Sequence, residues 1–160
     1  MENAFGEDQA VLELRTKNLA TVEEYFTYKG MDRGANRLRL WSESDCLFEL
    51  TYTESDKPRQ FVGRAALEEK ESVSNLAMFP DWGFEVLEIH QTDDPGYFIV
   101  ECIGRGVLLQ DGKEPSYYQN HYLIDFELDD GKIKTLREVH NPCNLMLALR
   151  EPLPQFPWHY

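Results

Sequence analysis

The stretch with the most chemical content covers residues 119–142, QNHYLIDFELDDGKIKTLREVHNP. Its alternating pattern and its Asp-Asp-Gly turn predict a β-hairpin, yet polar Asn120 stands near its start and Glu138 near its end. Leu136 and Val139 lie close to Glu138 in the sequence. A carboxylic acid in an apolar pocket has a raised pKa, so it can donate a proton at neutral pH. Glu138 is therefore the candidate catalytic acid, provided that this end of the hairpin lines a cavity.

Simple strand alternation offers another interpretation of Glu138. Side chains of a strand alternate between its two faces, so Glu138 shares a face with Lys132, Lys134, Leu136 and His140. That face is more polar than the wall of a pocket usually is. A solvent-facing carboxylate paired with a lysine therefore stays open beside the catalytic interpretation.

The first strand of the hairpin offers a pocket wall. Tyr118, Asn120 and Tyr122 fall on one apolar face, and we predict that Tyr118 and Asn120 bind substrate there. A packed tyrosine whose hydroxyl bonds to the backbone is the alternative for Tyr118. His121 falls on the opposite face, where a structural role, for example at a dimer contact, is favoured over catalysis.

Helices and further strands must position these residues. The spacing of apolar side chains predicts helices over residues 8–30 and 64–77, and Pro80 stops the second. A short hairpin is predicted over residues 46–63 and a long meander over residues 83–141. This order indicates an α+β fold, in which a strongly curved antiparallel sheet carries helices over its concave face. Such a cone encloses an apolar pocket that suits a small molecule.

The domain organisation is simple. The length of 160 residues fits a single domain over residues 1–160, with residues 1–10 expected to be flexible. Residues 151–160 contain three prolines, which predict an extended tail that packs on a surface or on a partner.

Composition excludes several classes of protein. Hydrophobic residues make up 42% of the chain, enough to bury a core, while 29 acidic against 16 basic residues give a net charge of −13. That field repels nucleic acid and anionic membranes, and no apolar run approaches the roughly 20 residues of a membrane helix. The acidic N-terminus lacks the features of a signal peptide. We therefore expect a cytoplasmic protein with no nucleic-acid or membrane partner.

The cysteines and histidines give no sign of a metal site. Three cysteines cannot all pair, and none lies in a Cys-x-x-Cys spacing, so free thiols in a reducing cytoplasm are the simplest account. The four histidines show no metal-ligand spacing on any one predicted element. No metal site is predicted.

A set of short motifs gives the chain a family resemblance. None is specific alone, but their order and spacing together resemble the phenazine biosynthesis protein A/B family over about residues 11–150. The motifs are FPDW (79–82), T-x-DP (92–95), VEC-x-G (100–104), NH (120–121), F-E-x-x-x-G-x-I-K (126–134) and RE-x-x-NP (137–142).

The resemblance implies a fold, an activity and site residues. It implies the cone fold of nuclear transport factor 2 and ketosteroid isomerase, and a homodimer that packs sheet against sheet. It implies cofactor-free, acid/base-assisted condensation of two amino-ketone carboxylates into the phenazine tricycle. Glu138 matches the family's glutamate acid/base, Arg37 its carboxylate-binding arginine, and Tyr118 an aromatic residue of the pocket. Arg39 is a competing choice for the arginine.

One segment departs from the family pattern. The active branch carries a His and a Ser on the helix before FPDW, and counting back from Phe79 places Glu71 and Asn75 there. Counting forward from Arg64 places Lys70 at the His position, because this segment is one residue longer. Glu71 and Asn75 lie four residues apart, so they share one helix face and become candidate substrate-binding residues. A solvated charged helix is the alternative.

The missing His puts catalysis in doubt and leaves three functions open. The first is the family condensation. The second is an isomerase or cyclase of the same fold acting on another small substrate. The third is a non-catalytic binding paralogue that holds the intermediate or forms a heterodimer with an active partner.

Overall fold

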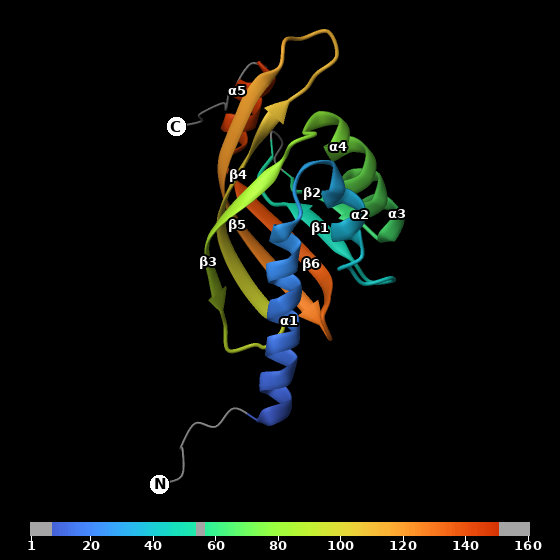
Figure 1. Ribbon diagram of the computed structural model, residues 1–160, viewed down its shortest axis with the longest axis vertical. Coiled ribbons are helices and arrows are strands. Elements are labelled where there is room, and N and C mark those ends of the chain that lie inside the picture. The colour runs from blue at the N-terminus through green and yellow to red at the C-terminus, as the bar shows by residue number, and fades with distance from the viewer. Residues whose placement is uncertain (1–7, 54–56, 151–160) are drawn as a thin grey trace, which may run out of the picture.

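The computed structural model describes residues 8–53 and 57–150. Within them, six strands form one curved sheet in the order β2-β1-β6-β5-β4-β3, and helices cover its concave side (Figure 1). The strands are β1 (Leu47–Leu50), β2 (Arg59–Val62), β3 (Gly83–Gln91), β4 (Tyr97–Leu108), β5 (Ser116–Asp129) and β6 (Lys132–His140). The helical segments are α1 (Gln9–Thr27), η1 (Gly30–Asp32), α2 (Arg33–Leu38), α3 (Arg64–Glu69), the π-helical turn η2 (Lys70–Ser74), α4 (Asn75–Met78) and α5 (Pro142–Leu149).

The α+β prediction is confirmed, with one difference in strand direction. Neighbouring strands pair antiparallel except β1 and β6, which run parallel with Leu47 opposite Thr135. Trp41 forms a further parallel bridge with Ile133, so the segment before β1 already runs beside the start of β6. A short strand that joins a distant partner carries no sign of its direction in its own sequence.

The long helix closes the cone with an aromatic core. The side chain of Asp8 accepts a hydrogen bond from the Ala10 N–H and caps α1. Tyr25 and Phe26 of this helix meet Phe126 edge-on, with ring centroids 5.4 and 5.8 Å apart. Such pairs add to the free energy of burial because the positive edge of one ring faces the negative face of the other.

A polar residue fixes α1 to two turns of the sheet. Asn18 is fully buried; its Nδ2 donates to the Pro95 carbonyl at 3.0 Å and its Oδ1 accepts from the Gly131 N–H at 2.7 Å. Each of these groups would otherwise be buried without a partner, which is costly. The helix is therefore held in one register across the sheet.

A bulge in β6 changes the face on which Glu138 lies. Glu127 pairs with Thr135 but Leu128 pairs with Ile133, so Lys134 is an extra residue on β6. After the bulge, Leu136 and Glu138 pair with inward-facing residues of β5. The expected sharing of a face by Glu138, Lys132 and Lys134 is therefore wrong, because the bulge shifts the alternation by one residue.

The two lysines before Glu138 are engaged away from the cavity. Lys132 is exposed and donates to the Arg39 carbonyl at 2.7 Å, and Lys134 approaches Asp45 at 4.0 Å. The polar appearance of this strand in the sequence thus comes from residues on its outer side.

Glycines on β4 leave room for an indole ring. A Cβ at Gly104 would lie 2.3 Å from Cζ2 of Trp82, and one at Gly106 would lie 3.2 Å from Cε3 of the same ring. The pairing of β4 with β5 continues without a shift through both positions. These glycines therefore place Trp82 flat against the sheet.

The ends of the chain lie mostly beyond the described residues. The first helix begins at Gln9, so residues 9 and 10 of the segment expected to be flexible are helical. The proline-rich tail predicted for residues 151–160 falls outside the described residues. Among the described helices, none combines the length and the apolarity needed to cross a bilayer.

We predict that Gly104→Ala lowers the free energy of unfolding by about 1–3 kcal/mol, because the new methyl group overlaps the Trp82 ring. Urea unfolding measures the change. In Gly104→Ala/Trp82→Phe the overlap with the indole ring is removed and the contact of the added Cβ with Cε2 of Tyr122, at 2.8 Å, remains. The losses of the two single variants should therefore sum to more than the loss of the double variant. Strictly additive losses would contradict the packing role of Gly104.

Candidate functional site

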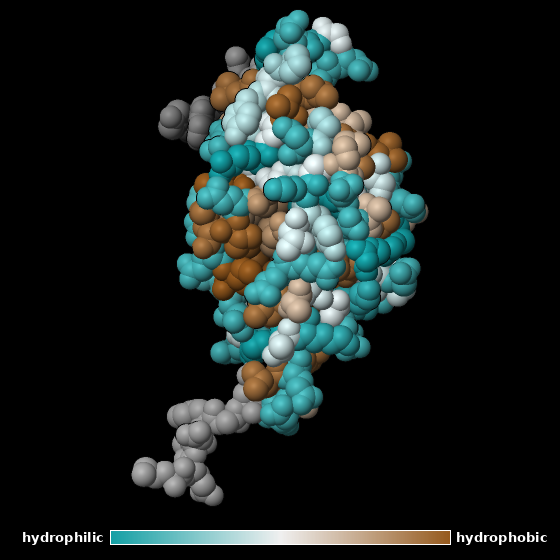
Figure 2. Space-filling model, viewed as in Figure 1, coloured by the Kyte–Doolittle hydropathy of each residue, from teal (hydrophilic) through white to brown (hydrophobic). Residues whose placement is uncertain are grey.

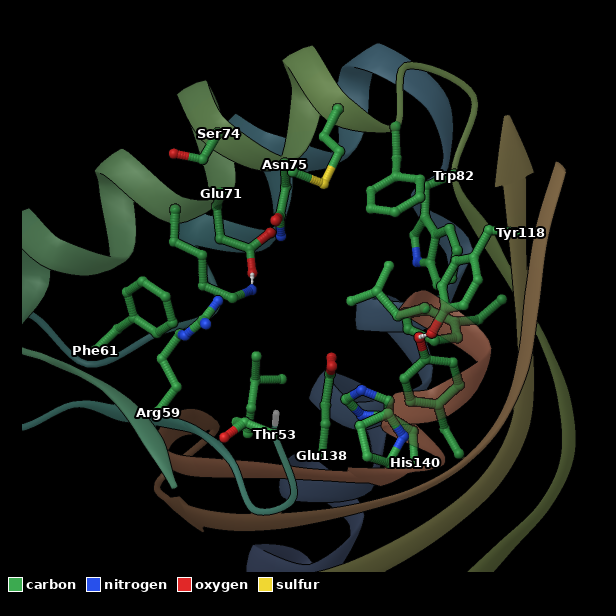
Figure 3. Close-up of a pocket in the computed structure, with 18 of the residues that line it drawn as sticks. Thr53, Arg59, Phe61, Glu71, Ser74, Asn75, Trp82, Tyr118, Glu138 and His140 are labelled. Carbon is green, nitrogen blue, oxygen red and sulfur yellow. Dashed lines mark hydrogen bonds and ion pairs between the residues drawn. The ribbon is translucent and has the colours of Figure 1, made fainter. Parts of the chain in front are cut away.

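A cavity of about 670 Å³ opens between the concave face of the sheet and the helices α2 to α4. Its size suits a small organic ligand. Figure 3 shows Glu138 and His140 rising from β6, Glu71 and Asn75 descending from the helical wall, and Trp82 with Tyr118 at one side. Apolar side chains make up much of the remaining lining, among them Leu50, Phe61, Met78, Phe79, Phe84, Leu145, Met146 and Leu149.

Glu138 has the electrostatics of an acid/base residue. Burial raises the pKa of its carboxyl to about 7; Glu71 adds to the rise, while Lys70 and Arg37 oppose it. Among the described residues, none forms a hydrogen bond with this carboxyl that would fix its charge state. Because its pKa lies near neutral pH, the group can both release and take up a proton there.

The helical wall carries a buried ion pair at the π-helical turn. Lys70 and Glu71 are 6% and 1% exposed, and Nζ of Lys70 lies 2.7 Å from Oε1 of Glu71. The same ammonium lies 3.5 Å from the centroid of the Phe48 ring, a cation–π contact. A π turn is a one-residue insertion in a helix, which accounts for the extra residue noted in this segment.

The pair keeps Glu71 charged. Burial pushes the pKa of this carboxyl up, but Lys70, Arg37 and Arg33, with the hydrogen bond from Lys70, bring it below its ordinary value. Its second oxygen, Oε2, is buried and has no hydrogen-bond partner. Glu71 and Glu138 thus stand on opposite walls with different charge states near neutral pH.

Arg37 lines the cavity but is committed to the fold. Its Nε donates to the Tyr25 carbonyl at 3.1 Å and its Nη2 to the Tyr28 carbonyl at 2.9 Å. The guanidinium also lies over the Tyr25 ring at 4.4 Å. The edge that would hold a carboxylate in two parallel bonds is therefore occupied, and a substrate contact through Nη1 stays a prediction.

Arg39, the competing arginine, lies outside the cavity. Its Nη2 donates to the Tyr28 hydroxyl and to Asn36 Oδ1 at 3.2 and 2.7 Å. The residue is exposed and is not part of the cavity lining.

Tyr118 forms the aromatic wall, and Asn120 supports it. Tyr118 stacks on Trp82 with ring centroids 5.6 Å apart, and its hydroxyl shares a 2.9 Å hydrogen bond with the Tyr122 hydroxyl. Asn120 is not among the lining residues; its Nδ2 donates to the Tyr118 hydroxyl and to the Asn141 carbonyl. The structure places Asn120 behind the wall, at the start of α5.

Asn75 lines the cavity together with Glu71, as their four-residue spacing indicates. Its carbonyl accepts a hydrogen bond from Nη2 of Arg33 at 2.8 Å. His121, in contrast, lies on the outer face, where its Nε2 is 2.7 Å from Glu101 Oε1. That position agrees with a structural role.

Several lining residues were not proposed as site residues from the sequence, among them the titratable groups Arg33, Lys70 and His140. Burial lowers the pKa of His140, so its ring is neutral at neutral pH, and its Nδ1 is buried without a partner. Burial also lowers the pKa of Arg33 to about 10, and this group stays charged. Strand alternation had placed His140 on the face of Glu138, and counting from Arg64 had placed Lys70 at the family's His position, but neither signal showed that the two side chains line a cavity.

The cavity is basic although the chain is strongly acidic and hydrophilic residues cover much of the surface seen in Figure 2. With Glu138 protonated, the charged lining side chains are four cations against one anion, whereas the whole chain carries −13. This excess favours an anionic ligand such as a carboxylate. The described charged residues of the lining are Arg33, Arg37, Arg59, Lys70, Glu71 and Glu138.

One group with metal-binding donors lies outside the cavity. Glu88 and His90 of β3 and Glu101 of β4 bring one ligand atom each within 4.8 Å of one another. Strand pairing, with Glu88 opposite Glu101, creates this group, so spacing on single elements could not show it. Such donors suit a divalent cation. The absence of a metal site stays a prediction.

A curved six-stranded sheet that closes with helices over a small pocket defines the class of nuclear transport factor 2-like and SnoaL-like proteins. Two solved structures show this fold: a putative isomerase from Bacillus subtilis (TM-score 0.71, 20% identity, 89% of this chain and 99% of the other) and a putative SnoaL-like polyketide cyclase from Jannaschia sp. (TM-score 0.66, 18% identity, 92% and 99%).

Within that class, the chain belongs to the phenazine biosynthesis protein A/B family, whose model matches residues 2–158. It is 45% identical over 143 residues to phenazine biosynthesis protein PhzB1 of Pseudomonas aeruginosa, covering 89% of this chain and 86% of the relative. It is 42% identical over 149 residues to PhzA2 of the same species, and the match covers 90% of this chain and 87% of the relative. The crystal structure of PhzB2 of P. aeruginosa superposes with a TM-score of 0.84 at 40% identity, covering 95% and 97%.

The raised pKa of Glu138 predicts a pH dependence of stability. Its carboxyl has a pKa of about 7 when folded against an ordinary 4.5, so the folded state binds more protons between these values. The contribution of Glu138 to the free energy of unfolding is therefore greatest below pH 4.5 and falls as pH rises to about 7, by about 3 kcal/mol in all. Urea unfolding from pH 4.5 to 8 measures it.

Glu138→Gln is the control for this prediction, because an amide does not titrate. The difference between the two unfolding curves isolates the contribution of Glu138 from those of other groups. A difference that stays constant across the pH window would contradict the raised pKa.

Proposed function

We propose that this protein promotes the acid/base-assisted condensation of two amino-ketone carboxylate molecules in phenazine biosynthesis. The observation that carries the proposal is the carboxyl of Glu138, which lines a basic cavity and whose pKa is raised to about 7, chiefly by desolvation. Membership in the phenazine biosynthesis protein A/B family supports the pathway. The basic lining suits carboxylate substrates.

The reaction needs one residue that gives a proton and takes one back. The amine of one molecule attacks the ketone carbon of the other and forms a carbinolamine. Protonated Glu138 donates to the carbinolamine hydroxyl, which leaves as water while the nitrogen lone pair forms the C=N bond. The Glu138 carboxylate then removes the N–H proton of the iminium and restores the acid. The products are an imine and one water molecule, and no cofactor is consumed.

The cavity supplies proximity. Two reactants held in register react as one molecule, which in ideal cases lowers the barrier by about 7–11 kcal/mol. Trp82 and Tyr118 form a flat wall on one side, and Figure 3 shows Arg59 and Phe61 opposite it. Flat ring substrates fit between such walls.

We predict that Glu138→Gln abolishes the acceleration of tricycle formation, because the amide cannot donate a proton to the leaving hydroxyl. Loss of a general acid typically costs about 10²–10⁴-fold in rate. Absorbance of the tricyclic product, with and without protein, measures the rate. Glu68→Gln, an exposed residue of α3 outside the cavity lining, is the matched control. Unchanged product formation with Glu138→Gln would refute the role of Glu138.

The Lys70–Glu71 pair favours a second candidate, an isomerase or cyclase acting on another small substrate. An ion pair at the position of the family's His changes the charge of the helical wall and with it the acceptable substrate. A non-catalytic paralogue that works as a heterodimer is the third. A pH–rate profile with an apparent pKa near 7 that Glu138→Gln removes would separate both enzymes from the non-catalytic paralogue.

We also propose that the protein forms a homodimer through the outer face of the sheet. On that face, Leu123 of β5 pairs with Val139 of β6 and with Glu101 of β4, and Ile99 and Ile103 of β4 are its diagonal neighbours. Leu123 is 46% exposed, which is unusual for a leucine at the centre of a sheet. A second copy would cover this apolar group, as the family resemblance implies.

Leu123→Arg tests the dimer, because a buried guanidinium without a partner opposes association. We expect the variant to elute as a monomer in size-exclusion chromatography with light scattering. Leu12→Arg, equally exposed at 46% but on α1, should leave the mass unchanged. A Leu123→Arg variant with the mass of the wild type would exclude this face.

We also propose that the protein is located in the cytoplasm. Cys46, Cys102 and Cys143 are free, which suits a reducing cytoplasm. The absence of a membrane-spanning helix among the described residues is compatible with that location.

A further inference from the structure

We propose that Glu71 is an amine-binding subsite, which takes the ammonium group of a small zwitterionic amino acid on its Oε2, while Lys70 serves as its internal counterion. The inference deepens the proposed function and rests on it, because it assigns a place to the amine that the condensation requires. It concerns residues of this chain that occupy the position of the family's His.

The π-helical turn is what creates the subsite. Neighbouring residues of an α-helix point about 100° apart, so one of two is normally turned away from a given wall. In η2, however, both Lys70 and Glu71 are buried and both line the cavity. The carbonyl of Glu71 also lies 2.8 Å from where a Cβ of Gly34 would stand, so α2 presses directly on this turn. The backbone that carries the Glu71 side chain is therefore positioned by packing from outside the cavity.

The carboxyl of Glu71 is only half satisfied. An ionised carboxylate has room for about four hydrogen bonds, and Lys70 supplies one to Oε1. Oε2 is buried and unpartnered. Buried polar atoms almost always have a partner, so this one calls for a donor that comes with the ligand.

Charge selects an ammonium group as that donor. When Glu138 is protonated, Glu71 is the only anion among the described residues of the lining. Lys70, Arg33 and Arg37 act on Glu71 and would repel an ammonium group, so only direct contact with Oε2 favours the nitrogen there, while the same cations attract a carboxylate. A zwitterion therefore has one favourable orientation, with its nitrogen at Glu71 and its carboxylate toward the arginines.

That orientation fits the proposed chemistry. Figure 3 shows the carboxyl of Glu71 directed across the cavity toward the side of Glu138. The ammonium group held at Glu71 has no lone pair, so it releases one proton to solvent before the amine attacks. The nitrogen then starts within the same chamber as the acid without occupying the acid itself. Glu138 is then left to act on the oxygen of the second molecule.

The test compares two ring carboxylates that differ in one group, 3-aminocyclohexanecarboxylate and cyclohexanecarboxylate. Isothermal titration calorimetry at pH 6 keeps the amine charged and most of Glu138 protonated. We expect wild-type protein to bind the amino compound at least about tenfold more tightly, as one charge-assisted hydrogen bond allows. Glu138→Gln should keep this preference, because Glu71 is intact.

The decisive variant is Lys70→Met/Glu71→Gln, which removes both charges and leaves no unpaired buried ion. It should bind the two carboxylates within about twofold of each other, with a thermal midpoint that shows a folded protein. Glu68→Gln, on the neighbouring helix α3, should behave like the wild type.

The outcomes separate this inference from the proposed function. A preference for the amino compound that survives in Lys70→Met/Glu71→Gln, or no preference in the wild type, would overturn the subsite while leaving the role of Glu138 intact. Failure of either carboxylate to bind the wild type would overturn both the proposed substrate class and the subsite.

Discussion

The free-energy cost of removing charged groups from water is the constraint on which the cavity depends. A carboxylate or an ammonium group loses most of its hydration on burial, and the loss is tolerated only with a partner or with a change of protonation. The cavity uses both solutions. Glu71 keeps its charge because Lys70 donates to it and two arginines lie near, whereas Glu138 has no such bond and holds its proton up to about pH 7. Two residues of one kind thereby acquire opposite properties from their surroundings.

The arginines show how scaffold and site share the same groups. Arg33 and Arg37 donate to main-chain carbonyls of Gly30, Asn75, Tyr25 and Tyr28, which join the end of α1 to the helices behind the cavity. Their charges still act within the cavity, since Coulomb interactions in a low-dielectric interior extend beyond contact distance. These side chains therefore shape the electrostatics of the cavity without being free to move toward a ligand.

Sequence patterns predicted the part of the fold that depends on local periodicity. The long helix, the final hairpin and the α+β class follow from the spacing of apolar residues, and Glu138 and Tyr118 were placed at the cavity by the family motifs. The bulge at Lys134 and the π turn at Lys70 could not be found in this way. Each is a one-residue irregularity that shifts every later side chain by one position, and periodicity assumes that no such shift occurs.

The remaining differences between the prediction and the structure arise from contacts between segments that are distant in the sequence. The engagement of Arg37 by two carbonyls depends on how the end of α1 meets α2, and the parallel alignment of β1 depends on β6, a distant segment. Asn120 looked like a pocket residue because its strand face is correct. Only the position of α5 showed that its amide is already bonded at Asn141.

The contact between Gly34 and the π turn has a consequence for how residues of this wall can be exchanged in evolution. An extra residue in a helix normally rotates everything that follows it, but here the widened turn is confined to Lys70–Ser74 and α-helical geometry resumes in α4 at Asn75. The absent side chain at Gly34 provides the space for the widened turn. The charged side chains of this wall can therefore be exchanged without a change in the path of the backbone. This holds as long as position 34 remains a glycine.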